Sequence, residues 1–279
     1  MKKRVFFGIF FVLLFVLNIA ALAQKKRSVK DLDPMYQKWL QEEVVYIITP
    51  KEKDVFLQLE TDQQREKFIE AFWKVRDPNP NTPENEFKTE HYRRIQYANQ
   101  YFGKEGPGEG WRSDMGRIYI ILGQPKTIER FENVTEVRPT IIWFYDGMIE
   151  YGLPNSFNVV FFKRDSVGEF ILYSPIQFGP QNLLWNYSGD MSDYRSAFNE
   201  LFDVEPTIAN VSLTLIPSEA QYTLGPSLAS EVLIGQKIPQ AGYEKVKDAY
   251  AEKLLAYRDI IEVDYTANYI DSDSVVRVF

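Results

Sequence analysis

Few side chains in this sequence are suited to acid–base or nucleophilic chemistry. Among the 279 residues there is no cysteine, and His91 is the single histidine. The lack of cysteine excludes a disulfide, a zinc–thiolate site and a thiol nucleophile. His91 is then the only imidazole base, and Ser113 and Asp114 are the residues that could complete a hydrolytic triad with it. Because no G-x-S-x-G elbow surrounds Ser113 and His91 falls on an apolar helix stripe, we expect a buried structural role for His91.

Metal and phosphate sites have equally little support. With one imidazole, a metal site would need mainly oxygen ligands, and the nearest approaches to such a set are the pairs Asp190/Asp193 and Asp271/Asp273. Neither pair has the ligand count or register of a calcium loop, so we expect turn and cap roles for both. The glycines of residues 103–110 follow a helix pattern and lack the Gly-Lys-Ser/Thr of a phosphate loop, which indicates a linker. We therefore expect no metal and no cofactor.

The composition limits the class of partner. Lys+Arg 32 against Asp+Glu 39 gives a formal net charge of -7. No global positive field would therefore attract phosphates, and we expect no nucleic-acid partner. A hydrophobic share of 45% and a charged share of 25% are those of a globular protein, which excludes disorder throughout.

The N-terminus has the pattern of an export signal. Basic residues 2–4 precede an apolar run at residues 5–17, and Ala21-Leu22-Ala23 supplies the small residues of a cleavage site before Gln24. The run is shorter than the roughly 18 residues of a spanning helix, which favours a cleaved signal peptide (residues 1–23) over an anchor. With no cysteine to carry a lipid, we expect a periplasmic or extracellular protein that is not lipidated and, after cleavage, has no transmembrane anchor. Export without cysteine suggests a bacterial envelope.

Hydrophobic periodicity then gives the elements that must position these residues. Thr61 and Gln64 form a capping-box pattern, and Thr82 followed by Pro83 is typical of a helix start. On such signals the expected helices are residues 35–43, 61–77, 82–102, 192–202 and 243–257. The expected strands are residues 44–49, 117–122, 140–145, 157–163, 169–173, 210–216 and 261–269. Glu90 and Arg94 are expected to pair one turn apart on the exposed side of their helix.

These elements predict an α+β fold in which N-terminal helices pack on an antiparallel β-meander. A smaller, incomplete mixed α/β segment follows. The expected division is a signal peptide at residues 1–23, a first domain at 24–203 and a second segment with a helix and a β-hairpin at 204–279. Because the sequence stops at the apolar Val278-Phe279, we expect it to be truncated.

A set of short strings in the first domain occurs in a distinctive order. They are Phe72-Trp73-Lys74-Val75-Arg76-Asp77-Pro78, Thr82-Pro83, Arg93-Arg94-Ile95, Gly110-Trp111-Arg112-Ser113-Asp114-Met115-Gly116-Arg117, Gly123-Gln124-Pro125 and residues 143–147. In order and spacing they resemble the GWxTD domain over roughly residues 42–173, with Ser113 at the threonine position. The resemblance implies a largely bacterial, exported family whose members are often longer at the C-terminus. It offers no catalytic residues to carry over.

Physical chemistry gives the motif a structural interpretation first. Gly110 permits an unusual backbone angle and a close approach, Trp111 is expected to fill the seam between helices and sheet, and Asp114 is expected to accept backbone N–H bonds or to pair with an arginine. The motif residues of interest are Gly110, Trp111, Ser113, Asp114, Gly116 and Arg117. Their candidate partners are Arg76, Asp77, His91, Arg93 and Arg94, and for Asp114 the arginines are Arg117, Arg93 and Arg76. In the alternative, an exposed Trp111 stacks on a sugar or peptide that Asp114 and Arg112 hydrogen-bond.

We therefore expect an exported, non-enzymatic binding or scaffold component of the bacterial cell envelope, with an envelope protein or glycan as partner. The alternative is a hydrolase that acts on envelope glycans or peptides through carboxylates near Trp111. Paired acids for glycoside hydrolysis stay open, since any two of the 39 acidic residues could meet in the fold.

Overall fold

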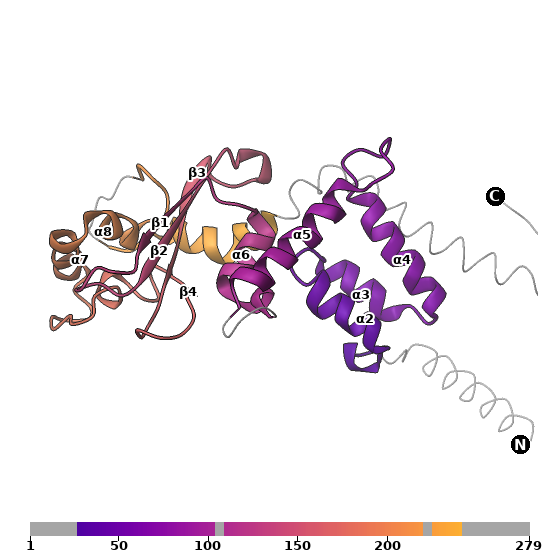
Figure 1. Cartoon of the computed structure of the whole chain (residues 1–279), viewed down its shortest axis with the longest axis horizontal. Helices are drawn as coiled ribbons and strands as arrows, with labels where there is room; N and C mark the ends of the chain where they lie inside the picture. The colour runs from indigo at the N-terminus through magenta and orange to yellow at the C-terminus, as the bar shows by residue number, and fades with distance from the viewer. Residues whose placement is uncertain (1–26, 104–108, 220–224, 242–279) are drawn as a thin grey trace, which may run out of the picture.

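The computed structural model describes residues 27–103, 109–219 and 225–241. Figure 1 shows an elongated molecule with a helical lobe at one end and a sheet lobe at the other. The helical lobe is formed by residues 29–75, and the sheet lobe by the described part of residues 114–241. Helices precede strands along the chain and the strands form one antiparallel sheet, which confirms the expected α+β class.

The helical lobe is a chain of short capped helices. They are a 3-10 turn η1 (Val29–Asp31), α2 (Pro34–Lys38), a π-helical turn η2 (Trp39–Glu43), α3 (Pro50–Gln58) and α4 (Asp62–Val75). The predicted capping box of Thr61 and Gln64 is present at the start of α4. The strand expected at residues 44–49 is wrong, because Thr49 instead caps α3 through a second capping box with Glu52. Val44, Ile47 and Ile48 lie in backbone turns before Thr49 with their side chains buried, whereas Val45 is exposed.

Aromatic rings hold this lobe together. Trp39 of η2 lies at the centre, with its ring centroid 5.0 Å from that of Phe56 and 5.2 Å from that of Phe72. Phe68 packs edge-to-face on Phe56 at 5.3 Å. Such pairs contribute roughly 0.5–1.5 kcal/mol each beyond the area that they bury, so the lobe has a core of its own.

Helix α5 (Glu86–Tyr101) is shared by both lobes. Phe87 and Tyr92 in its first half pack against the helical core, whereas Tyr97 and Phe102 at its other end pack against the sheet core. The expected cap at Thr82 is wrong. Asn85 caps the helix by accepting a hydrogen bond from the Lys88 amide, while the Thr82 hydroxyl is used in the preceding turn, where it bonds Glu86 at 2.7 Å.

A short turn and a helix follow, where a strand was expected. They are η3 (Gly110–Arg112) and α6 (Asp114–Leu122). The strand predicted at residues 117–122 is wrong because Ser113 caps a helix here. A continuous apolar run that is buried on nearly all sides has no periodicity with which to tell a helix from a strand.

The sheet is a four-stranded antiparallel meander in the order β1-β2-β3-β4. Its strands are β1 (Thr127–Phe131), β2 (Thr140–Asp146), β3 (Ser156–Phe162) and β4 (Ile171–Leu172). The strands expected at residues 140–145 and 157–163 are confirmed, and the one at 169–173 is shorter than expected. Strand β1 was not predicted, because it is an edge strand with a largely exposed, polar sequence.

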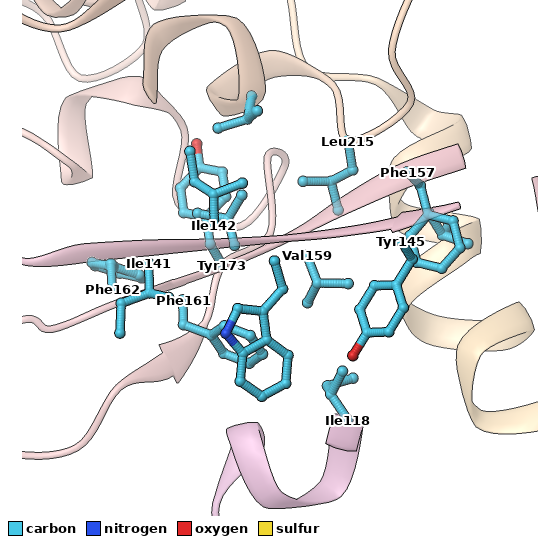
Figure 2. Packing of buried hydrophobic residues seen from close by; sticks show 14 of the residues in the cluster. Ile118, Ile141, Ile142, Tyr145, Phe157, Val159, Phe161, Phe162, Tyr173 and Leu215 are labelled. Carbon is cyan, nitrogen blue, oxygen red and sulfur yellow. The ribbon is translucent and has the colours of Figure 1, made fainter. Parts of the chain in front are cut away.

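Both faces of the central strands are buried. In Figure 2, Tyr145 and Val159 lie on the face turned toward Ile118 of α6, and Ile142 lies on the opposite face, on the side of Leu215. That second face is covered by α7 (Tyr194–Val204) and α8 (Pro206–Leu213), and the Tyr173 hydroxyl donates a hydrogen bond of 2.8 Å to the carbonyl of a residue in α8. Helix α9 (Leu228–Val232) and the π-helical turn η6 (Leu233–Lys237) complete the lobe.

The C-terminal part of the chain agrees only partly with expectation. The helix expected at residues 192–202 is present as α7, but residues 210–216 belong largely to α8, which Pro206 opens at a first-turn position. The helix expected at 243–257, the strand at 261–269 and the Asp271/Asp273 pair lie outside the described residues. Buried residues from 208 to 241 join the same core as the sheet. A domain boundary at residue 204 stays a prediction.

None of the described helices has the length and apolar character needed to cross a membrane.

Candidate functional site

The motif lies where α5, η3 and α6 meet, and its glycines are sites of backbone contact. A Cβ atom on Gly110 would lie 1.9 Å from the carbonyl oxygen of Ala98 in α5, and one on Gly116 would lie 1.9 Å from the carbonyl oxygen of Gly110. The three backbones are therefore stacked with no room for a side chain between them. Close approach explains Gly110, and the unusual backbone angle is not needed, since Gly110 does not have a positive φ.

Ser113 fixes the start of α6 with one hydroxyl group. Its Oγ donates to the Gly110 carbonyl at 2.7 Å and accepts from the Gly116 amide at 3.0 Å. A side-chain oxygen at this position satisfies a backbone N–H that the helix leaves without a partner. Both hydrogen-bonding directions of the hydroxyl are therefore used inside the motif.

Asp114 joins α6 to the edge of the sheet. Its Oδ2 accepts the backbone N–H of Leu172 in β4 at 2.8 Å, and its Oδ1 accepts from Arg117 at 3.1 Å. The carboxylate also lies in the first turn of α6, where the helix dipole favours negative charge. Of the three arginines that the sequence offered as partners, the fold selects Arg117.

The other candidate arginines have partners of their own. Arg76 is buried and binds both carboxylate oxygens of Glu52 at 3.0 and 2.9 Å, which ties the end of α4 to the start of α3. Arg93 pairs with Glu90 at 2.6 Å. Asp77 accepts the backbone N–H of Asn79 at 3.0 Å in the turn after α4. These residues therefore brace the helices of their own region.

Arg94 has a larger role than its sequence pattern indicated. The expected pair with Glu90 is present at 2.7 Å. In addition, its Nη1 donates to the carbonyls of Ile120 and Ile121, both at 3.2 Å, in the last turn of α6. A guanidinium at a helix C-terminus satisfies carbonyls that have no partner within the helix. Arg94 therefore holds the end of α6 against α5.

Trp111 connects the motif to the helical lobe through its backbone. Its N–H donates to Asn99 Oδ1 at 3.0 Å, and its carbonyl accepts from the Tyr46 hydroxyl at 3.0 Å. The indole is half-buried, with the Arg112 guanidinium 4.9 Å from its ring centroid and the Tyr46 ring at 6.3 Å. Part of the Trp111 side chain therefore stays accessible to solvent.

A different tryptophan fills the seam between helices and sheet. Trp143 of β2 is 1% exposed, and its ring centroid lies 5.5 Å from that of Phe102, 6.3 Å from that of Tyr119 and 4.8 Å from that of Phe161. Sequence reasoning assigned this place to Trp111. Trp143 lies within an apolar run that was predicted as a strand, and this position was the signal in the sequence that it is buried.

His91 is buried in the helical lobe. Its Nε2 lies 2.6 Å from the carbonyl oxygen of Glu43, which can only accept, so Nε2 carries the proton in the neutral ring. Burial lowers the pKa of His91 to about 4. The hydrogen bonds of Ser113 go to Gly110 and Gly116 and not to this imidazole. His91, Ser113 and Asp114 are therefore not joined by hydrogen bonds as a catalytic triad would be.

The acidic pair in the sheet lobe has local roles. Asp190 accepts from the amide and the hydroxyl of Ser192 at 2.8 and 2.7 Å, and Asp193 caps α7. Within residues 27–103, 109–219 and 225–241, no group of three or more His, Cys, Asp or Glu side chains could hold a metal ion.

Comparison with known proteins identifies the family. A family model described as the GWxTD domain matches residues 25–167. This range includes the motif, the helices α5 and α6 and the strands β1 to β3, and it ends before β4. No curated protein and no solved structure matches the chain. Since the matched residues make up about half of the sequence, the chain belongs to the GWxTD domain family.

Proposed function

We propose that this protein is an exported, non-enzymatic binding or scaffold component of the bacterial cell envelope, with an envelope protein or glycan as its partner. The signal-peptide pattern of residues 1–23 supports export. The observation that carries the non-enzymatic assignment is the use of the motif's polar groups within the fold. The Ser113 hydroxyl and the Asp114 carboxylate are hydrogen-bonded to backbone groups of α6, η3 and β4.

The partial exposure of Trp111 supports a binding role. Tryptophan and arginine are enriched at protein–protein contacts and at the positions that contribute most to affinity. Here the Arg112 guanidinium lies over the indole of Trp111. The turn η3 therefore holds the two side chains in contact before any partner binds. Preorganised side chains lower the entropic cost of binding.

The hydrolase alternative has less support at this site. Glycosidases place two carboxyl groups across a cleft, roughly 5–10 Å apart. The carboxylates around Trp111 are arranged differently, because Glu42 and Glu109 both face Arg112, at 3.9 and 3.1 Å. Asp114, the third carboxylate, is bonded to a strand and an arginine.

Affinity capture from envelope extracts tests the proposal. We expect the purified protein to retain a protein or glycan whose binding is reproduced with the isolated partner, and we expect Trp111→Ala to weaken that binding. Trp185→Ala is the matched control, because Trp185 is also a half-buried indole beside an arginine, with Arg138 at 4.7 Å.

Two outcomes would count against the proposal. One is repeated failure to recover any partner. The other is turnover of an envelope glycan or peptide that Asp114→Asn abolishes while the melting temperature stays that of the parent.

A further inference from the structure

A cavity of about 430 Å³ opens in the sheet lobe, among β3, α7, α8 and the turn that follows α8. Helices α7 and α8 are labelled in Figure 1, at the end of the molecule far from the helical lobe. The volume falls in the range of roughly 300–1,000 Å³ that small-molecule sites occupy. No motif residue lines the cavity, so it is a separate site.

The cavity joins an apolar wall to two amide side chains. Phe198 and Ile216 contribute to the wall, and Asn158 and Asn210 line the same space. Asn158 interrupts an otherwise apolar run in β3, where asparagine is a poor strand former. Within the described residues, neither amide side chain has a hydrogen-bond partner. Each amide can therefore both donate to and accept from a ligand.

A carboxylate on the rim of the cavity is held in place by hydroxyl groups. Glu219 Oε2 accepts hydrogen bonds from the hydroxyls of Thr214 and Ser227, the latter at 2.7 Å. Within the part of the chain that the structure describes, no hydrogen bond uses Oε1. A carboxylate with one oxygen fixed and the other available is prepared to accept a donor from a ligand.

The start of the turn that carries Glu219 is anchored to β3 and to α9. The backbone N–H of Asn158 in β3 donates to the Leu215 carbonyl at 2.7 Å, and the backbone N–H of Leu215 donates to the Ser230 hydroxyl at 2.7 Å. Ser218, in the same turn, has a φ of 65°, which costs a residue other than glycine roughly 1–3 kcal/mol. Hydrogen bonds therefore tie the start of this turn to the elements that form the cavity wall.

The chemistry of the lining selects the ligand. Among the residues that line the cavity in the described part of the chain, Glu219 is the only charged one. Its carboxylate repels a phosphate or a carboxylate, and no cation in this lining offsets that repulsion. Amide and carboxylate groups bind hydroxyl and amino groups, and the flat ring of Phe198 suits the C–H face of a sugar.

We propose that this cavity binds a neutral or amino sugar, either free or at the end of a glycan chain. The inference rests on the proposed function and narrows its partner to a glycan.

Calorimetric titration of the purified protein tests the assignment. The probes are N-acetylglucosamine, glucosamine, a soluble oligomer of N-acetylglucosamine, and glucuronic acid as the anionic comparison. We expect the neutral or amino sugars to bind and glucuronic acid not to bind. Tighter binding of the oligomer than of the single sugar would identify a glycan chain as the source.

Cavity variants make the test specific. Asn158→Leu, Asn210→Ala and Glu219→Gln should each weaken sugar binding by about tenfold, the loss expected for a hydrogen bond left unmade. Asn210 is exposed, so Asn210→Ala leaves the fold intact, and Asn186→Ala is the matched control at an exposed asparagine outside the cavity. Equal binding by Asn210→Ala and Glu219→Gln would overturn the proposal, and so would equal binding of glucuronic acid.

The two proposals fail in different ways. If none of the sugars binds but the protein still retains an envelope partner, the cavity proposal is wrong and the proposed function stands. If a sugar binds in the cavity but no envelope partner is recovered, the envelope function is wrong and the sugar site stands.

Discussion

The substitution Gly116→Ala should destabilise this protein, although the same change usually stabilises a helix by roughly 0.5–1 kcal/mol. Gly116 lies in the first turn of α6, where an added Cβ would meet the Gly110 carbonyl oxygen at 1.9 Å. Non-bonded carbon contacts normally lie near 3.5 Å, so the turn η3 would have to move by more than about 1 Å. That movement would also disturb the Ser113 cap and the contact of Gly110 with Ala98.

The expected loss of stability is the sum of three contributions. Overpacking costs roughly 1–3 kcal/mol and a disturbed cap about 1 kcal/mol, from which the helix preference of alanine subtracts up to about 1 kcal/mol. We expect the free energy of unfolding to fall by about 2 kcal/mol. For a chain of this size, the melting temperature should then fall by roughly 4–8 °C.

Thermal and urea unfolding of Gly116→Ala measure this effect. The matched control is Gly235→Ala, because Gly235 is also a helical glycine but a Cβ there would meet nothing within 4 Å. The control should melt at or slightly above the parent. If Gly116→Ala also melts at or above the parent, the stacking of η3 between α5 and α6 does not explain the motif.

Three further predictions test the packing and the electrostatics. Trp143→Ala should cost about 3–5 kcal/mol because its indole is buried, whereas Trp111→Ala should cost much less; chemical denaturation compares the two. Arg76→Met should cost about 3–5 kcal/mol, since it leaves the Glu52 carboxylate buried without its arginine, and the same denaturation experiment measures it. Stability should also fall as the pH drops from about 6.5 to about 4, because the unfolded chain binds a proton at His91 near pH 6.5 but the folded chain does so only near pH 4. The full loss is roughly 3 kcal/mol, and urea midpoints of the parent and His91→Phe across this range should show that the variant lacks this part of the slope.

Each of these expectations has a contrary result. Equal losses for the two tryptophans would mean that Trp111 is the seam residue after all. A neutral Arg76→Met would show that Glu52 finds another partner. A parent and a His91→Phe variant with the same pH dependence would show that His91 titrates normally in the folded state.

From the sequence, helix α4 and strands β2 and β3 were predicted correctly, whereas three short segments were predicted as strands and have another structure. Helix α4 has a capping box, and strands β2 and β3 have β-branched and aromatic residues between turn signals. The strand predictions that failed are of two kinds. Residues 44–49 and 117–122 are short, mostly apolar runs without a clear period, whereas residues 210–216 alternate polar and apolar side chains as a strand does but belong largely to helix α8. For two of them a cap signal was present, because Ser113 and Pro206 each open a helix.

The motif was harder to predict than the fold class. Local reasoning suggested the close approach of Gly110 and gave Asp114 a bonding role, but three arginines were equally available to Asp114 in the sequence. Only the fold decides which one is near, because Arg76 and Arg93 belong to helices with acidic partners of their own. The contact of Asp114 with Leu172 spans 58 residues of sequence, and no local pattern indicates it.

Because both lobes share helix α5, neither lobe is an independent folding unit. Its first half completes one core and its second half completes the other, so a cut on either side would leave a stripe of aromatic side chains in water. Neither lobe is then free to be exchanged, duplicated or expressed without the whole of this helix. Because α5 packs against both cores, unfolding of one lobe would remove packing from the other. We therefore expect heat to melt the described part of the molecule in one step.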